Sequence, residues 1–170
     1  CSPIATNAWA GTTSHYQVSS GKAKIITNGT SQATLPVASG ITGSQGEIGA
    51  SFSGLSGSMI RGVISSTDST NTASNHVRAI ISASAAVVAL IDTTGGVTTT
   101  VSKGVSDGFV VGSAHELLLR CERNQVSGTE TWSVFVDGVK WIESDTINQS
   151  FNDHNGLYKS GTAIGDFVDD

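Results

Sequence analysis

Residues 115–143, HELLLRCERNQVSGTETWSVFVDGVKWIE, predict three antiparallel strands in a row. Residues 116–123 and 129–136 alternate as strands with two distinct faces do. A third strand starts at Val139, directly after Asp137-Gly138, which is a dipeptide suited to the positive φ angles of a type I′ turn. Large apolar residues occur on both faces of the second strand, so we expect it to be covered on both sides or to line a groove.

The remainder of the chain repeats this pattern of short alternating segments between turns rich in Gly, Asn and Ser. No segment keeps a helical period over three turns. Many short strands with turn signals between them predict an all-β fold, a two-sheet antiparallel sandwich or a barrel. No linker is visible, so we expect residues 1–170 to form one domain, trimmed at one or both ends.

Composition excludes several classes of protein. The net charge is −5, and the nine Lys and Arg residues form no cluster, which argues against a nucleic-acid partner. The longest apolar run, residues 83–91, is too short to span a bilayer. Cys121 lies inside a predicted strand and is interpreted as a buried thiol; a bridge to Cys1 is the alternative. Mature bacterial lipoproteins begin with Cys, so lipid anchoring through Cys1 also stays open.

The pairing of Glu116-Leu117-Leu118-Leu119 with 132–139, WSVFVDGV, resembles the concanavalin A-like, or laminin G-like, jelly-roll superfamily. In that superfamily a strand of the form E-L-x-L is followed by a variable loop and W-x-V-x-V-D-G-V. The segments 16–18, 58–61, 156–158 and 166–170 fit other strands of the same template. The resemblance implies a concanavalin A-like jelly-roll sandwich, and its motifs specify the ligand poorly.

Some members of this superfamily are glycosidases, and their catalytic strand carries E-x-D-x-x-E, which places carboxylates on one face. The sequence contains no such run and no G-x-S-x-G motif. We therefore expect a non-catalytic protein and keep a glycosidase or lyase remnant as the third hypothesis.

Laminin G-like jelly rolls often hold calcium through loop carboxylates, so the resemblance suggests a calcium site as one alternative. The other interpretation is ordinary solvated acids in loops. The candidate ligands are acidic residues of two polar loops and the C-terminal segment, namely Asp68, Asp145, Asp153 and Asp166, together with Asp169 and Asp170.

Carbohydrate binding needs aromatic surfaces beside hydrogen-bonding groups. Trp141 is the aromatic candidate, although a core or interface position is the other interpretation, and Trp9 and Trp132 are expected in the core. The amide candidates lie in the two polar loops, 66–75 and 144–155, and are Asn71, Asn75, Asn152 and Asn155.

The first functional hypothesis is a non-catalytic module on the surface of a virus particle, such as a phage decoration, fibre or tail-associated protein. It rests on the Ser-, Thr-, Gly- and Val-rich composition with 14% charged residues. Such a module recognises a glycan or neighbouring virion subunits, and a homo-oligomer is one assembly compatible with this hypothesis. The alternative is a carbohydrate-binding or adhesion module of a secreted or surface bacterial protein. Both place the chain on a virion surface or outside the cell.

Overall fold

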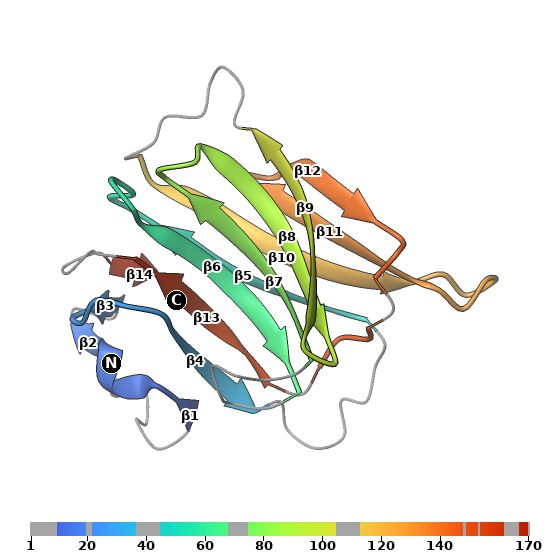
Figure 1. Ribbon diagram of the computed structural model, residues 1–170, viewed down its shortest axis with the longest axis horizontal. Helices are drawn as coiled ribbons and strands as arrows, with labels where there is room; N and C mark the ends of the chain where they lie inside the picture. Colours follow the sequence, from blue (N-terminus) through green and yellow to red (C-terminus); the bar gives the residue numbers. More distant parts are fainter. Residues whose placement is uncertain are drawn as a thin grey trace.

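The predicted all-β jelly-roll sandwich is confirmed in a computed structural model of the chain (Figure 1). The structure describes residues 10–19, 22–36, 45–67, 75–104, 113–147, 149–152, 154–161 and 167–169. Two seven-stranded sheets stack face to face, and every strand pair in them is antiparallel.

We call the two layers sheet A and sheet B. Sheet A runs, in spatial order, through β1 (Ala10–Gly11), β4 (Ser31–Pro36), β13 (His154–Ser160), β6 (Ile60–Ser66), β7 (His76–Ser82), β8 (Val87–Thr94) and β9 (Val97–Gly104). Sheet B runs through β12 (Val139–Ser144), β11 (Glu130–Val136), β10 (His115–Arg123), β5 (Gly46–Phe52), β14 (Phe167–Asp169), β3 (Lys22–Ile25) and β2 (Tyr16–Ser19). A short 3-10 helix, η1 (Thr13–His15), precedes β2.

The stretch 115–143 forms three adjacent strands of sheet B, β10, β11 and β12, as predicted. Asp137 and Gly138 have φ angles of 52° and 77°, the left-handed values of the predicted turn. The Asp137 carboxylate accepts hydrogen bonds from the Glu116 backbone N–H at 2.9 Å and pairs with His115 Nδ1 at 2.8 Å. Asp137 therefore has two roles: its backbone forms the turn, and its carboxylate connects the turn to the start of β10.

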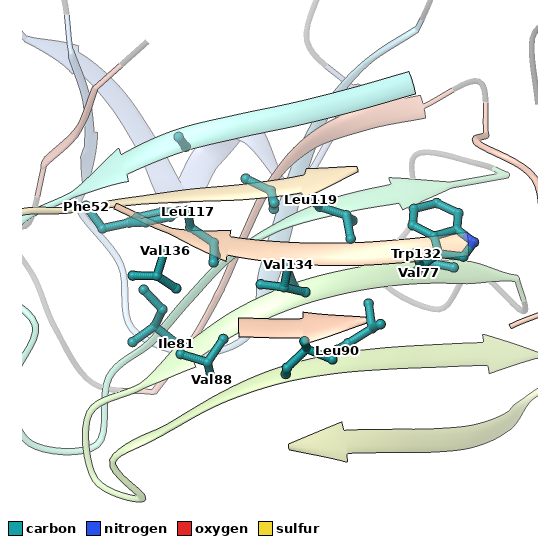
Figure 2. Close-up of a cluster of buried hydrophobic side chains, with 14 of the residues drawn as sticks. Phe52, Val77, Ile81, Val88, Leu90, Leu117, Leu119, Trp132, Val134 and Val136 are labelled. Atoms are coloured by element: carbon teal, nitrogen blue, oxygen red, sulfur yellow. The ribbon is translucent and has the colours of Figure 1, made fainter. Parts of the chain in front are cut away.

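The core fills the space between the sheets, where every second residue of each strand points inward (Figure 2). Leu117, Leu119 and Val134 of sheet B face Val77 and Leu90 of sheet A. Trp132 is fully buried among them, as the sequence predicted, and its Nε1–H donates to the Gln149 carbonyl at 2.8 Å. Cys121 is a buried thiol in the same layer; Cys1 and Trp9 lie outside the described residues.

Two cations are buried on the inner side of sheet A. Arg61 and Lys159 are register partners on β6 and β13, and each is 1% exposed. Lys159 Nζ donates to the carbonyls of Thr27 and Gly29, and Arg61 Nη1 donates to the Ile60 carbonyl at 2.8 Å. Burial, with a further contribution from the Arg61 charge, lowers the pKa of Lys159 to about 8.

We expect Lys159 to make the stability of the protein rise with pH above about 8. In the unfolded chain the pKa of this lysine returns to 10.5, so between the two values the unfolded state binds a proton that the folded state has released. Raised pKa values of Tyr16 and Cys121, each about 12 because of burial, act in the opposite direction at higher pH. The effect of Lys159 is therefore read from the difference in unfolding free energy between wild type and Lys159→Met, measured at each pH.

In urea denaturation this difference in unfolding free energy should change by about 2 kcal/mol between pH 7.5 and pH 10, in favour of wild type. Lys140→Met, at an exposed lysine, is the matched control and should show no comparable change. An unchanged difference for Lys159→Met would mean that the amine is not perturbed by burial.

Candidate functional site

Polar side chains form a row across the outer face of sheet A, the face turned away from sheet B. Direct register partners share a face, and the row follows the pairing of β13, β6, β7, β8 and β9 in turn. It consists of His154, Ser66, His76, Thr93 and Thr98. The Thr93 and Thr98 hydroxyl oxygens are 3.1 Å apart and form a hydrogen bond. The row therefore places hydroxyl and imidazole groups along one line of the sheet, with Ser66, His76 and Thr93 buried, His154 half-buried and Thr98 exposed.

An aromatic and apolar cluster lies beside this row, on the same outer face. The Arg78 guanidinium sits over the Tyr158 ring, with Cζ 4.5 Å from the ring centroid. Tyr158 also packs with apolar residues that are separate from the core between the sheets. We call this cluster the Tyr158 platform; its members are Tyr158, Arg78, Ile60, Ile80, Ala89 and Ile91. Tyr158 and Arg78 are half-buried, whereas Ile80, Ala89 and Ile91 are buried.

Glycine forms part of the floor of the platform. Gly62 is the register partner of both Tyr158 and Ile80. A Cβ at Gly62 would lie 2.2 Å from the Ala79 carbonyl oxygen and 2.8 Å from Ile80 Cγ2. Only glycine lets the backbones approach so closely here, and it leaves Tyr158 with no side chain directly opposite it on β6.

The two outer faces of the sandwich differ in charge. Within the described strands, the outer face of sheet A carries Arg78, His76 and His154 and has no carboxylate. The outer face of sheet B carries both signs: the carboxylates Glu47, Glu116, Glu122 and Glu143, and the cations Arg120, Lys24 and Lys140, with Arg120 bonded to Glu47 at 2.9 Å and Lys140 bonded to Glu143. The platform is thus a locally basic region on a chain whose net charge is −5.

The buried polar atoms near the platform that lack a hydrogen-bond partner in the described part of the chain include Arg78 Nε and His154 Nδ1. Buried polar groups are normally satisfied by protein or by ordered water. Both atoms belong to basic side chains of the outer face, so a ligand or water with acceptor oxygens would satisfy Arg78 Nε.

The structure brings three of the predicted amides to one end of sheet A and uses them to hold loops. Asn75 Oδ1 accepts from the Gly95 backbone N–H at 2.9 Å. Asn152 Nδ2 donates to the Ser65 carbonyl at 3.4 Å and its backbone N–H donates to Ser65 Oγ at 2.8 Å, while Asn155 Nδ2 donates to the Asn152 carbonyl at 2.9 Å. The fourth amide, Asn71, lies outside the described residues.

Trp141 lies away from these amides, at the side of the sandwich where β12 and β9 contact each other. Its half-buried ring packs against the core, and Lys103 Nζ stands 5.5 Å from its centroid. Gly95, the partner of Asn75, lies in the turn before β9, and Lys103 is six residues along β9 from Val97, which corresponds to roughly 20 Å of extended strand. Trp141 and Asn75 therefore do not form one site.

Of the predicted metal ligands, Asp145 is an exposed side chain after β12. Asp68, Asp153, Asp166 and Asp170 lie outside the described residues, and Asp169 is described only by its backbone in β14. Among the side chains that the structure describes, no group of three His, Cys, Asp or Glu residues is placed to hold a metal ion. The same part of the chain has no helix long and apolar enough to cross a membrane.

Ile147 and residues 149–151, expected as part of a polar loop, fold into the end of the sandwich. Gln149 is buried, and its Nε2 donates to the Thr93 carbonyl and Thr94 Oγ1, both at 2.9 Å, and to Asp92. Phe151 stacks on Trp132 with ring centroids 6.1 Å apart. Ile147 and Phe151, the two large apolar residues of this loop, were the sequence signal for this structural role.

Sequence reasoning missed the platform. His76 and Arg78 alternate with Val77 and Ala79 in residues 76–82, so their shared face was visible in the sequence. Tyr158 comes 80 residues later, and only the pairing of β13 with β6 brings it beside Arg78.

Comparison with known proteins identifies the fold of the chain. No protein-family model matches the chain, and no curated protein matches it by sequence. Among solved structures, the carbohydrate-binding module CBM66 from Bacillus subtilis superposes with a TM-score of 0.67 at 11% identity, over 96% of this chain and 92% of that one. The chain has a concanavalin A-like jelly-roll fold.

Two further structures share this concanavalin A-like fold. A Bacillus licheniformis β-glucanase has a TM-score of 0.61 at 12% identity, over 94% of this chain and 87% of that one. Sheep galectin-11 has a TM-score of 0.53 at 15% identity, over 85% of this chain and 98% of that one. Enzymes and binding proteins therefore both occur on this fold, so the function has to be argued from the site.

Proposed function

We propose that this concanavalin A-like domain binds glycans, and preferentially glycans that carry carboxylates, on the outer face of sheet A. The observation that carries the proposal is the Tyr158 platform beside the row of hydroxyl and imidazole side chains. Sugar rings pack their C–H faces on aromatic and apolar surfaces, and their hydroxyls bond to groups such as the half-buried His154 imidazole and the exposed Thr98 hydroxyl of the row. Among the structural neighbours, one is named a carbohydrate-binding module, which supports the ligand class.

The preference for carboxylates follows from the charge of the face. Arg78 is its one guanidinium, and guanidinium groups bind carboxylates through paired, charge-assisted hydrogen bonds. The Tyr158 ring holds that guanidinium in place from one side. An acidic sugar residue on the platform would thus meet a positioned cation, whereas a neutral sugar would use only the ring and the hydroxyls.

We propose binding without cleavage of the glycan, and the virus-particle setting stays a prediction from composition. The β-glucanase neighbour makes hydrolysis the competing hypothesis. Incubation of the protein with each bound oligosaccharide, followed by a reducing-end assay, decides between the two: release of reducing ends would establish hydrolysis.

A glycan array with neutral and uronate-containing oligosaccharides tests the proposal. We expect binding to the carboxylated members, and Tyr158→Ala should weaken it about tenfold, the worth of one aromatic contact. The matched control is Phe135→Ala, because Arg120 stacks on Phe135 at 5.0 Å on the outer face of sheet B in the same way. Equal losses in the two variants, or no binding to any glycan, would contradict the proposal.

A further inference from the structure

The exposed edge strand β9 is the feature from which we infer a second binding surface. All eight of its residues are exposed, and β8 is its single neighbour in the described sheet (Figure 1). Edge strands are usually protected by charge, proline or a bulge, because their free N–H and C=O groups pair with other strands. The strand VTTTVSKG has no proline and one charge, Lys103, which is drawn toward the Trp141 ring.

Exposed apolar side chains occur on β9 and on β12, the strand of sheet B that contacts it. Of the five large hydrophobic residues that are exposed in the described part of the chain, Val97 (71%), Val101 (39%) and Val139 (62%) belong to β9 and β12. These two strands contact each other where the edges of the two sheets meet. A strand added to β9 would cover part of this apolar side.

The hairpin geometry determines which groups of β9 are free to pair. Gly95 and Gly96 form a two-residue turn with φ angles of 57° and 83°, so Thr94 and Val97 close the ladder as a hydrogen-bonded pair. Hydrogen-bonded and non-hydrogen-bonded pairs then alternate along the strand. The N–H and C=O groups of Thr98, Thr100 and Ser102 consequently point to the open edge.

We propose that β9 pairs with β9 of a second copy of this chain, antiparallel about a two-fold axis at Thr99. This register places Val97 opposite Val101 of the other copy on both sides of the axis. It also makes Thr98 and Thr100 reciprocal hydrogen-bonded partners through their edge-facing groups. The edge-facing N–H and C=O groups of β9 therefore allow a register in which the strand pairs with itself. A two-fold interface needs such self-complementarity.

Charge is compatible with this pairing. In the proposed register Lys103 lies opposite Gly95 of the other copy, so the two lysines stand at opposite ends of the ribbon. Sheet A would continue as one sheet through both copies, and the outer faces with their Tyr158 platforms would lie on the same side of it. The dimer would then present two platforms to one glycan chain; this consequence, unlike the pairing itself, rests on the proposed function.

Sedimentation velocity of the full chain over about 1 to 500 µM tests the pairing, and we expect a monomer–dimer equilibrium. Thr100→Pro removes an N–H that points to the open edge and leaves the bonds to β8 in place, so it should shift the association at least tenfold toward monomer. Thr100→Ser keeps the N–H and should behave as wild type. A wild-type monomer throughout the series, or a dimer that Thr100→Pro leaves intact, would overturn the proposal.

A cross-linking experiment tests the register even if Thr100→Pro impairs folding. In a Cys1→Ser background, Thr99→Cys places two cysteines across the axis in a non-hydrogen-bonded pair, and mild oxidation should give a covalent dimer. Val126→Cys, at a fully exposed hairpin tip (97%), is the control for random collision. Cross-linking of Thr99→Cys that is no faster than that of Val126→Cys would contradict the register.

Discussion

Trp132→Ala should lower the free energy of unfolding by about 4 kcal/mol, the larger loss of the two tryptophans that the structure describes. The Trp132 side chain is completely buried between the sheets and stacks on Phe151. Its removal leaves a cavity and an unpaired Gln149 carbonyl, which now accepts from Trp132 Nε1 at 2.8 Å. Because Gln149 in turn holds the end of β8 through Thr93 and Thr94, the damage should extend to that end of the sandwich.

Trp141→Ala is the matched control and should cost about 1 to 2 kcal/mol, since this ring is only half-buried at the side of the sandwich. Urea denaturation followed by circular dichroism measures both values. If Trp141→Ala proved as damaging as Trp132→Ala, the assignment of the core would be wrong.

The fold was predictable because its decisive signals are local. Alternation in 116–123 and 129–136 and the Asp137-Gly138 turn each depend on neighbours in the chain, and each appears in the structure as predicted. The position of Trp141 was harder to predict because a β-bulge interrupts the pairing of β11 and β12. Val134 pairs with Ile142 and Phe135 with Lys140, so Trp141 is the extra residue and simple alternation does not assign its face.

The candidate site was not predictable, because it depends on register between strands far apart in sequence. Arg78 and Tyr158 meet only because β6 pairs with β7 on one side and β13 on the other. The polar composition of 144–155 suggested a binding loop, yet Gln149 and Asn152 bond to the ends of strands. Polarity alone does not distinguish a residue that binds a ligand from one that caps a strand.

Arg78→Gln should weaken binding of a carboxylated oligosaccharide about 10- to 100-fold. A charge-assisted hydrogen bond contributes about 1.5 to 3 kcal/mol, and each 1.4 kcal/mol is a tenfold change in affinity. Glutamine keeps a donor and much of the side-chain length but removes the charge and the planar fork. Binding of a neutral oligosaccharide of the same length should fall only a few-fold.

The matched control for this change is Arg120→Gln on the outer face of sheet B. Arg120 also stacks on an aromatic ring, that of Phe135, and is bonded to Glu47. The two substitutions alter the net charge of the protein equally, so a general electrostatic effect would appear in both. Only a direct contact with the ligand at the platform should make Arg78→Gln the more damaging change.

Isothermal titration calorimetry of wild type, Arg78→Gln and Arg120→Gln with one uronate oligosaccharide therefore tests the glycan site most directly. We expect wild type and Arg120→Gln to bind with the same affinity and Arg78→Gln to lose affinity at least tenfold. Equal affinities for all three proteins, or a loss confined to Arg120→Gln, would show that the outer face of sheet A is not the binding site.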